Sequence, residues 1–305
     1  MRAVFFGYHN MGVLGIAKLL EHRFEIPLVF THTDSASEEN IWFASVAELC
    51  RKLSLKYVTP ENPNTPEWLS RIRECRPDII FSFYYRFMIS KDILEIPPYG
   101  AYNLHGSLLP AYRGRAPVNW VIIRGEETTG VTLHEMVVKP DAGPIVAQAQ
   151  VKIAPDDTPV RLFAKLEEAA ARMLDEVLPG IREGRIPKRE QDLSRGSYFG
   201  GRKPEDGRIS WGESARNIYN LIRGVTRPYP GAFGFLKDEK VLFWWAAVRE
   251  GPELEPGEIA VRGETVLIGT ACGVLVPSEI EVEGKVYTNN EIAEYFEPHK
   301  GECMT

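Results

Sequence analysis

Hydrophobic and polar positions follow two different patterns along this chain. In the first part, short apolar runs alternate with amphipathic stretches of helical period, which is the pattern of βαβ units around a parallel sheet. In the second part, one amphipathic stretch is followed by several short apolar runs that Gly and Pro separate. Strands spaced so closely are typical of a small β-barrel. The pattern therefore predicts an α/β domain followed by a smaller β domain.

The apolar periodicity gives each expected element its boundaries. Strands are predicted over 3–6, 26–30, 78–81, 100–104 and 129–138, and helices over 12–22, 41–53 and 158–184. Beyond them, a helix is predicted over 214–224 and strands over 241–248, 259–261, 266–268 and 274–277. The segment 196–207 between the two groups is rich in glycine and charge, so we place the boundary there and expect domains 1–200 and 201–305.

Composition is that of a soluble globular protein. Of the 305 residues, 44% are hydrophobic and 26% are charged, which is too apolar for disorder. The four cysteines (Cys50, Cys75, Cys272 and Cys303) are dispersed without a CxxC pair, which indicates free thiols and argues against a structural zinc site. The chain opens on a strand pattern instead of a signal peptide, and no apolar run is long enough to span a membrane. We therefore expect a cytoplasmic protein with no metal and no membrane partner.

The charge balance bears on possible partners. The formal net charge is -6, and no lysine-rich run interrupts the sequence. A protein that neutralises many phosphates of a nucleic acid needs at least a locally basic region. Nucleic acid is therefore not an expected partner.

One segment concentrates residues that can carry chemistry. It reads N-L-H-G-S-L-L-P over 103–110, and P-D-A-G follows at 140–143. Asn103 and His105 are two positions apart at the carboxyl end of a predicted strand, so their side chains share one face and point to the crevice where open α/β sheets bind ligands. A single histidine after a strand is more often structural. The Gly and Pro that follow His105, however, indicate a loop, where binding residues concentrate.

These residue types suit acyl transfer to an amine. That reaction needs a donor for the oxyanion of a tetrahedral intermediate and a group that moves the proton of the amine. The amide of Asn103 and the imidazole of His105 supply both. Asp141 is the candidate carboxylate for the ring, and we expect it to set the tautomer of His105 and to raise its pKa by favouring the charged form. Asn103, His105 and Asp141 are thus the predicted catalytic residues.

The same segment resembles the folate-dependent formyltransferase family, whose members share an N-x-H signature, then S-L-L-P and a later D-x-G. All of these elements occur here in order, and the resemblance covers essentially the whole chain. It implies a Rossmann-like formyltransferase domain in front of an OB-like β-barrel. It also implies that Asn103 stabilises the oxyanion, that His105 is the acid and base, and that Asp141 is its partner.

The family implies a co-substrate, N10-formyltetrahydrofolate, and no metal. The folate would lie along the backbone of three residues after the predicted strand at 78–81, beside an arginine, and against the turn that holds Asp141. The implied contacts are Phe87, Met88, Ile89, Arg115, Val137, Val138, Lys139, Pro140 and Asp141.

Within the family, the likeness is greatest to the formyltransferase domain that acts on UDP-4-amino-4-deoxy-L-arabinose, an aminosugar of lipid A modification. The stretches that carry this likeness are 8–16, 30–34, 81–86, 113–117 and 229–233. The sequence has no counterpart of the dehydrogenase-like half that accompanies that domain, so oxidative decarboxylation is not expected. The resemblance implies formyl transfer to the 4-amino group of a nucleotide-linked aminosugar.

The glycine-punctuated turn at 7–12 invites a dinucleotide interpretation, but it is not GxGxxG. It is either a tight turn between strand and helix or a pocket for the sugar, with Tyr8, Asn10 and Met11 as candidate contacts. Both interpretations stay open at this point.

Two positions near the domain boundary are candidates for the nucleotide part of the substrate. Arg202, next to Lys203, can pair with a diphosphate, although solvated surface charge is the commoner explanation. Tyr229 lies between two prolines and can stack on a nucleobase or simply pack. The oligomeric state, the nucleobase and the stereochemistry of the sugar stay open.

Three alternatives accompany the aminosugar interpretation: a methionyl-tRNA formyltransferase, a formyltetrahydrofolate hydrolase, and a folate-binding module without activity. The first is disfavoured by the net charge and by the short acidic segment 34–40, where that group carries a longer basic loop. The second would use water in place of the amine. The intact set of three predicted catalytic residues argues against the third.

Overall fold

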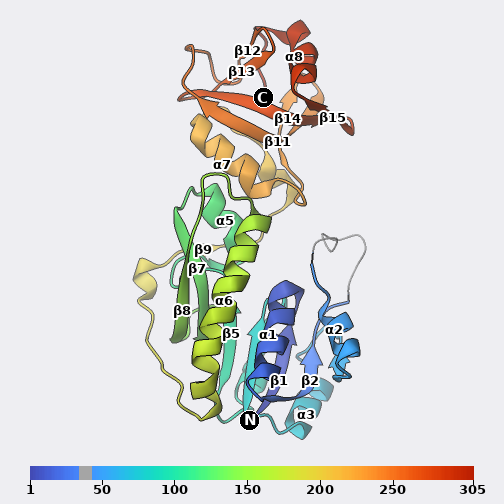
Figure 1. Ribbon diagram of the computed structural model, residues 1–305, viewed down its shortest axis with the longest axis vertical. Coiled ribbons are helices and arrows are strands. Elements are labelled where there is room, and N and C mark those ends of the chain that lie inside the picture. Colours follow the sequence, from blue (N-terminus) through green and yellow to red (C-terminus); the bar gives the residue numbers. More distant parts are fainter. Residues whose placement is uncertain (34–42) are drawn as a thin grey trace. The chain divides into compact units, whose positions relative to one another are not determined.

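The computed structural model describes residues 1–33 and 43–305 (Figure 1). The acidic segment 34–40 and the first two residues of the helix expected at 41–53 lie outside the described residues. The described part forms two compact units: residues 1–117, 128–152 and 163–200 make the first, and residues 118–127, 153–162 and 201–305 make the second. The second unit therefore takes two short segments from before residue 200, and a single boundary between 200 and 201 stays a prediction.

The first unit is built on a seven-stranded sheet with the strand order β3-β2-β1-β4-β5-β7-β8. The strands are β1 (Arg2–Gly7), β2 (Glu25–Phe30), β3 (Tyr57–Val58), β4 (Ile79–Phe83), β5 (Ala101–His105), β7 (Thr128–Glu135) and β8 (Ile145–Lys152). Strands β1 to β5 pair in parallel, whereas β7 pairs antiparallel with both of its neighbours, β5 and β8. The strand order reverses between β1 and β4, which is where open α/β sheets form a ligand crevice at the carboxyl ends of the strands.

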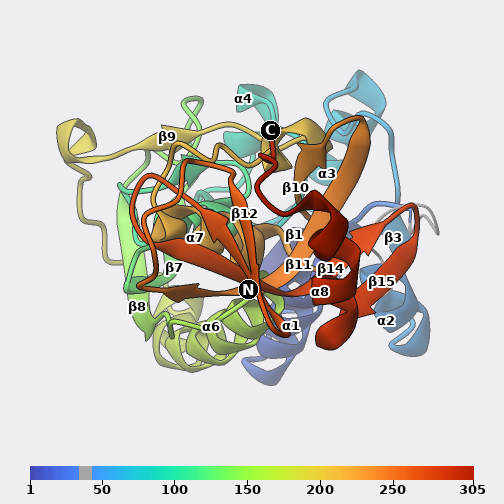
Figure 2. The same ribbon diagram turned by 90° about the horizontal axis from the view of Figure 1, so that it is seen from above.

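Helices cover both faces of this sheet, which explains its apolar strands. Helices α1 (His9–Glu21) and α6 (Pro159–Arg182) lie on one face, and α3 (Pro66–Glu74) and α4 (Lys91–Leu94) lie on the other (Figures 1 and 2). Every residue of β4 is buried, as expected for a strand with no solvent face. In α1, a Cβ at Gly15 would lie 2.4 Å from the ring of Phe83, so glycine is needed for the helix to pack this closely.

Most of the expected elements are present, and several short or weakly patterned elements were missed, α3, β8 and α8 (Asn290–Phe296) among them. Helix α2 (Val46–Lys52) begins at Ser45, whose hydroxyl accepts a hydrogen bond from the backbone N–H of Glu48 at 3.0 Å. The missed α3 buries only Ile72, so it lacks a full apolar stripe. The missed β8 has Gln148 half-buried and Gln150 exposed near its centre, and the missed α8 is short.

The second unit contains a six-stranded antiparallel sheet with the order β10-β11-β14-β13-β12, and β15 pairs with β14. The strands are β10 (Ala232–Leu236), β11 (Glu239–Arg249), β12 (Ile259–Arg262), β13 (Thr265–Gly269), β14 (Val274–Val282) and β15 (Lys285–Thr288). Helices α7 (Ala215–Val225) and α8 contribute to the same core, where Ile222 and Phe296 have no exposed surface.

Residues 301–305 fill the gap between the two edge strands of this sheet. Phe235 of β10 exchanges two backbone hydrogen bonds with Thr305, at 2.7 and 2.8 Å. On the other edge, Ile259 donates to the carbonyl of Glu302 and Met304 donates to the carbonyl of Gly257, both at 2.9 Å. The segment thus satisfies backbone groups that an edge would leave open. The predicted fold class, an α/β domain on a parallel sheet followed by a small antiparallel β domain, is confirmed.

Candidate active site at the carboxyl edge of the sheet

Strand β5 brings Asn103 and His105 to the carboxyl edge of the sheet. They alternate with the buried side chains of Tyr102 and Leu104, so Asn103 and His105 share the other face of the strand. Asn103 is half-buried, whereas His105 is 6% exposed. The amide therefore stays accessible to a ligand, while the imidazole is largely shielded from water.

Asp141 lies next to His105, as the sequence predicts. One carboxylate oxygen, Oδ1, is 3.6 Å from Nδ1 of His105, and the other accepts a hydrogen bond from the backbone N–H of Gly114 at 2.8 Å. Burial alone would raise the pKa of Asp141, but His105, His134 and the N–H of Gly114 together hold that pKa well below its usual range. Asp141 is therefore a carboxylate at neutral pH.

The tautomer of His105 is set by the backbone. Its Nε2 lies 2.8 Å from the carbonyl oxygen of Tyr112, which can only accept, so Nε2 carries the proton. The neutral ring then presents the lone pair of Nδ1 on the side of Asp141. The expectation that Asp141 sets this tautomer is wrong, because the carbonyl of Tyr112 already does so.

The pKa of His105 is lowered, contrary to the expected rise. Burial of the ring is the largest cause, and the positive charge of His134 in its protonated form adds to it; Asp141 and the carbonyl of Tyr112 raise the pKa but do not offset burial. Asp141 thus acts in the expected direction and is outweighed. The consequence is a neutral imidazole at pH 7, ready to accept a proton at Nδ1.

Strand β7 adds a buried histidine that sequence reasoning missed. His134 is paired directly opposite Asn103 in the register of β5 and β7, and it is 1% exposed. Its Nε2 lies 3.1 Å from the amide nitrogen of Asn103 and 3.5 Å from Oδ1 of Asp141. The available signal was a histidine near the end of the strand predicted over 129–138.

Buried hydrogen bonds fix the loop that follows β5. The hydroxyl of Thr132 donates to the carbonyl of Ser107 at 2.6 Å and accepts from the backbone N–H of Leu109 at 3.1 Å. The hydroxyl of Ser107 donates to the carbonyl of Ala111 at 2.7 Å. Neither Thr132 nor Ser107 has exposed surface. The carbonyl of Tyr112, which holds His105, therefore sits on a rigid support.

The segment after α6 braces the same region. Strand β6 (Arg113–Gly114) pairs in parallel with β9 (Tyr198–Phe199), and the backbone N–H of Tyr112 donates to the hydroxyl of Ser197 at 2.8 Å. The amide of Gln191 donates to the carbonyls of Asp141 and Gly143, at 3.0 and 2.6 Å. Both loops that carry the site are thus held by residues distant in the sequence.

Left-handed backbone occurs at several of these loop positions. Tyr84, Tyr112 and Asp141 have φ values of 59°, 58° and 52°. For a bulky residue such as tyrosine this conformation costs roughly 1–3 kcal/mol, and it persists only where the surroundings enforce it. Strain of this kind concentrates at functional sites, in agreement with the position of these residues around the crevice.

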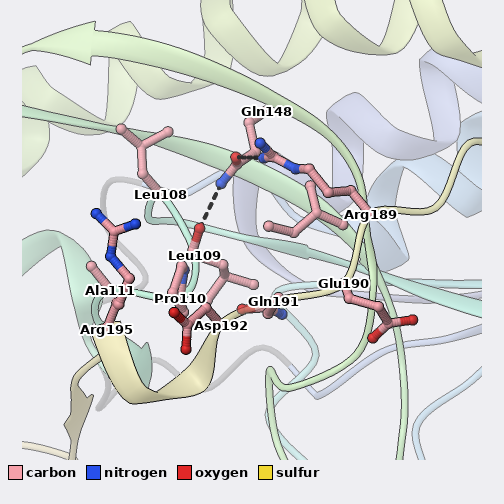
Figure 3. Close-up of a pocket in the computed structure, with 11 residues that line it drawn as sticks. Leu108, Leu109, Pro110, Ala111, Gln148, Arg189, Glu190, Gln191, Asp192 and Arg195 are labelled. Carbon is pink, nitrogen blue, oxygen red and sulfur yellow. Dashed lines mark hydrogen bonds between the residues drawn. The ribbon is translucent and has the colours of Figure 1, made fainter.

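A cavity of about 340 Å³ lies behind the loop after β5 (Figure 3). It is lined by residues 108–111, by Ile145 and Gln148 and by residues 189–192 and 195, not by the predicted catalytic residues. Gln148 donates to the carbonyl of Leu109 at 2.9 Å and accepts from Arg189 at 2.6 Å, so it links the loop to the segment after α6. Two arginines and two acidic residues line the cavity together, which favours neither anions nor cations.

The predicted folate contacts include exposed apolar side chains on two loops. Phe87 and Met88 are 41% and 58% exposed, and Val137 and Val138 are 39% and 67% exposed. Ile89, next to Met88, is buried in a hydrophobic cluster, and Met136, next to Val137, packs against the same cluster. The two loops are therefore anchored in one hydrophobic cluster. Exposed apolar surface of this kind suits a flat heteroaromatic ring.

The remaining predicted folate contacts surround this surface. Arg115 and Lys139 are exposed, and Pro140 is half-buried beside Asp141. The backbone N–H of Arg115 donates to the carbonyl of Phe199 at 3.0 Å, which fixes the main chain at this position. These folate contacts stay predictions.

The predicted sugar contacts at the turn after β1 have structural roles. Met11 has no exposed surface, so it is a core residue and offers no direct contact to a ligand. Asn10 donates to Glu167 at 2.8 Å and accepts from the backbone N–H of Ala44 at 2.7 Å. Tyr8 is buried and packs against the guanidinium of Arg86, 4.7 Å from its ring centroid. The tight-turn interpretation therefore accounts for Asn10 and Met11.

The two candidates for the nucleotide lie in the second unit. Arg202 stacks on the ring of Trp120 at 4.6 Å and donates to the carbonyl of Asp206 at 2.7 Å. Burial lowers its pKa, although an arginine stays charged at neutral pH. Tyr229 is half-buried and packs against the core of this unit. Their contacts with a nucleotide stay predictions.

Two further properties of the described residues bear on the class of protein. No helix among residues 1–33 and 43–305 is long and apolar enough to cross a membrane. In the same part of the chain, no three His, Cys, Asp or Glu side chains are grouped as metal ligands would be. The expected absence of a metal cofactor stays a prediction.

The fold and the site together define a class. An α/β sheet presents an accessible amide, a neutral imidazole and a carboxylate at the carboxyl ends of its strands, the groups that acyl transfer to an amine requires. Residues 1–178 match the family described as formyl transferase, and residues 202–295 match the formyl transferase C-terminal domain. The chain belongs to the formyl transferase family.

Solved structures show the same fold. The N-formyltransferase from Helicobacter canadensis, solved with folinic acid and dTDP-3-aminofucose, has a TM-score of 0.70 and 19% identity over 90% of this chain and 98% of its own. WlaRD, a sugar 3N-formyl transferase solved with dTDP and 5-N-formyl-THF, has a TM-score of 0.69 and 18% identity over 93% and 98%.

HypX from Aquifex aeolicus, in complex with tetrahydrofolic acid, is similar over 99% of this chain with a TM-score of 0.63 and 20% identity, but over only 48% of its own length. The chain thus spans about half the length of HypX. At these identities the likeness establishes the fold and not the substrate.

Proposed function

We propose that this protein transfers the formyl group of N10-formyltetrahydrofolate to the 4-amino group of a nucleotide-linked aminosugar, with UDP-4-amino-4-deoxy-L-arabinose as the acceptor. The observation that carries the proposal is the meeting of Asn103, His105 and Asp141 at the carboxyl edge of the sheet. Family membership supports formyl as the transferred group.

Each of the three residues has a different role in the reaction. The free amine attacks the formyl carbon, and the amide N–H of Asn103 stabilises the oxyanion that forms. His105 accepts the proton of the amine at Nδ1 and returns it to N10 as the carbon–nitrogen bond to the folate breaks. Asp141 stabilises the imidazolium between these two transfers. Formylated amine and tetrahydrofolate are the products, with no net gain or loss of protons.

A sugar amine is favoured as acceptor by two observations. The H. canadensis enzyme was solved with dTDP-3-aminofucose, WlaRD is a sugar 3N-formyl transferase solved with dTDP, and both align over nearly their whole length. The sequence stretches at 8–16 and 81–86 resemble instead the domain that acts on a 4-amino sugar. The position of the amine on the ring is therefore what an assay has to decide.

The proposal is tested by measuring formyl transfer to several acceptors with one donor. The purified chain is expected to formylate UDP-4-amino-4-deoxy-L-arabinose faster than dTDP-linked 3-aminosugars, and to leave methionyl-tRNA unmodified at moderate salt. Formylation of methionyl-tRNA at a comparable rate would overturn the sugar assignment. Release of formate without any acceptor, at the same rate as transfer, would indicate a hydrolase.

Replacing Asp141 by Asn is expected to move the rising limb of the pH–rate profile to lower pH. Asp141 raises the pKa of His105, so its loss lowers that pKa and keeps the ring unprotonated in more acidic solution. Asn tolerates the φ of 52° at this position, so the loop is expected to survive. A full rate with an unmoved limb would make Asp141 a structural turn residue.

Folinic acid is expected to stabilise the protein, by about 2.7 kcal/mol at about 100 times its dissociation constant. The physical basis is the exposed apolar surface formed by Phe87, Met88, Val137 and Val138. A thermal-shift assay measures this effect, with Met88→Ala as the weakened variant. NAD is the control and is expected to do nothing, because the dinucleotide fingerprint is absent; a shift with NAD alone would contradict the folate assignment.

A further inference from the structure

We infer that His134 is a positioning residue for formyl transfer: its ring accepts a hydrogen bond from the amide of Asn103 and so holds that amide with its second N–H free for the oxyanion. The inference rests on the proposed function for its effect on rate. Its structural content, the orientation of the Asn103 amide, is testable without turnover.

The sheet itself brings the two side chains together. Asn103 and His134 are directly opposite each other in the antiparallel pair of β5 and β7, and opposite residues of such a pair lie on one face with Cβ atoms about 4.5–5.5 Å apart. His134 is 1% exposed, so its ring has no room to turn to solvent. The 3.1 Å contact between His134 Nε2 and Asn103 Nδ2 is therefore a fixed feature of the sheet.

The tautomer of His134 decides which end of the amide faces it. Nδ1 lies 2.9 Å from the carbonyl oxygen of Glu135, which only accepts, so Nδ1 carries the proton of the neutral ring. Nε2 is then an acceptor, and the atom of Asn103 that faces it has to be the NH2 group. A turned amide would place its oxygen against the lone pair of Nε2. The amide nitrogen has two hydrogens, and only one of them is used by His134.

The carboxylate of Asp141 lies beside the contact between His134 and Asn103. Oδ1 of Asp141 lies 3.5 Å from Nε2 of His134 and 3.6 Å from Nδ1 of His105, and the two rings have centroids 6.5 Å apart. The carboxylate is too far for a good hydrogen bond to either ring. It is placed to stabilise a proton on His105, while His134 remains the partner of Asn103. Each histidine thus serves a different member of the predicted catalytic set.

Two substitutions of His134 distinguish the effect of losing its hydrogen-bond acceptor from the effect of losing the volume of its ring. His134→Met fills a similar volume without a strong acceptor, and His134→Gln restores a polar group that can accept from Asn103. With His134→Met we expect kcat to fall on the order of 10- to 100-fold, less than the loss of the amide itself, with the KM for donor and amine little changed. His134→Gln is expected to recover most of this loss.

A matched control and a double variant test whether His134 affects the rate through Asn103. Thr129→Val alters a buried residue of the same strand away from the site, and it is expected to keep the rate of the natural sequence. In an Asn103→Ala background, His134→Met is expected to have no further effect, because the group on which it acts is gone. An undiminished kcat in His134→Met, or an equal loss in both backgrounds, would overturn the inference.

A spectroscopic measurement on the unaltered protein covers the cases in which a variant fails to fold or the tested aminosugars are not accepted. With 15N-labelled histidine, the ring of His134 is expected to show a protonated Nδ1 and an unprotonated, hydrogen-bonded Nε2. The Nε2 signal is expected to shift when Asn103 is replaced by Ala. A protonated Nε2 in the unaltered protein would overturn the inference, whatever the acceptor of the enzyme proves to be.

Discussion

Replacing His105 by Ala is expected to lower kcat by roughly 10²- to 10⁴-fold, the range for losing a positioned acid and base. The structure identifies which ring nitrogen of His105 accepts the proton. Nε2 is tied to the carbonyl of Tyr112 at 2.8 Å, so only Nδ1 is free to take the proton of the amine. Burial keeps the ring neutral at pH 7, and Asp141 lies where the charge appears during the reaction. In the described site, the free ring nitrogen of His134 is instead occupied by the amide of Asn103, 3.1 Å away.

The measurement is the pH–rate profile of formyl transfer together with binding of folinic acid. The limb that reports the titration of His105 is expected to flatten, while the donor still binds. His22→Ala is a suitable control, because His22 pairs with Asp175 at 2.9 Å away from the site and is expected to be dispensable for rate. A His105→Ala enzyme with both the limb and the rate intact would remove His105 from the mechanism.

Replacing Asn103 by Ala is expected to lower kcat by roughly 10²- to 10³-fold, as for the loss of one oxyanion donor. The amide is half-buried and held by His134, so it reaches the transition state already oriented. An oriented donor stabilises the oxyanion without reorganisation, and this advantage appears in kcat more than in KM.

Steady-state kinetics with varied donor and acceptor measure this split. Asn290→Ala is the matched control: its amide donates to Glu264 at 2.9 Å on the surface of the second unit, and its loss is expected to leave kcat unchanged. A large rise in KM with an unaltered kcat would show that Asn103 binds the ground state and not the oxyanion.

The sequence predicted those parts of the molecule that local pattern determines. The two-residue spacing of Asn103 and His105 and the loop that follows them were readable, because alternation along a strand is a local property. The strand predicted over 78–81, observed as β4 (Ile79–Phe83), was readable because a strand covered on both faces is apolar throughout.

What the sequence could not provide depends on contacts between distant segments. The pKa of His105 has the opposite direction from the one expected, because the burial of the ring comes from the whole fold and exceeds the effect of Asp141. His134 was missed because its role depends on the register of β7 against β5. The hydrogen bonds that Gln191 donates to, and that Ser197 accepts from, the loops of the site join positions 48 to 85 residues apart, and no local pattern reports them.

The division of the chain into interleaved units limits how this protein can be recombined with its relatives. Within the second unit, Arg223 donates to the carbonyls of Ala154 and Asp157, at 3.3 and 3.1 Å, and Asn119 donates to the carbonyl of Gly224 at 2.9 Å. A chimera joined at residue 200 would set segments 118–127 and 153–162 of one parent against residues 201–305 of another. Exchange of substrate specificity by swapping whole C-terminal domains would therefore require those two segments to travel with the domain, as a discontinuous cassette of three pieces.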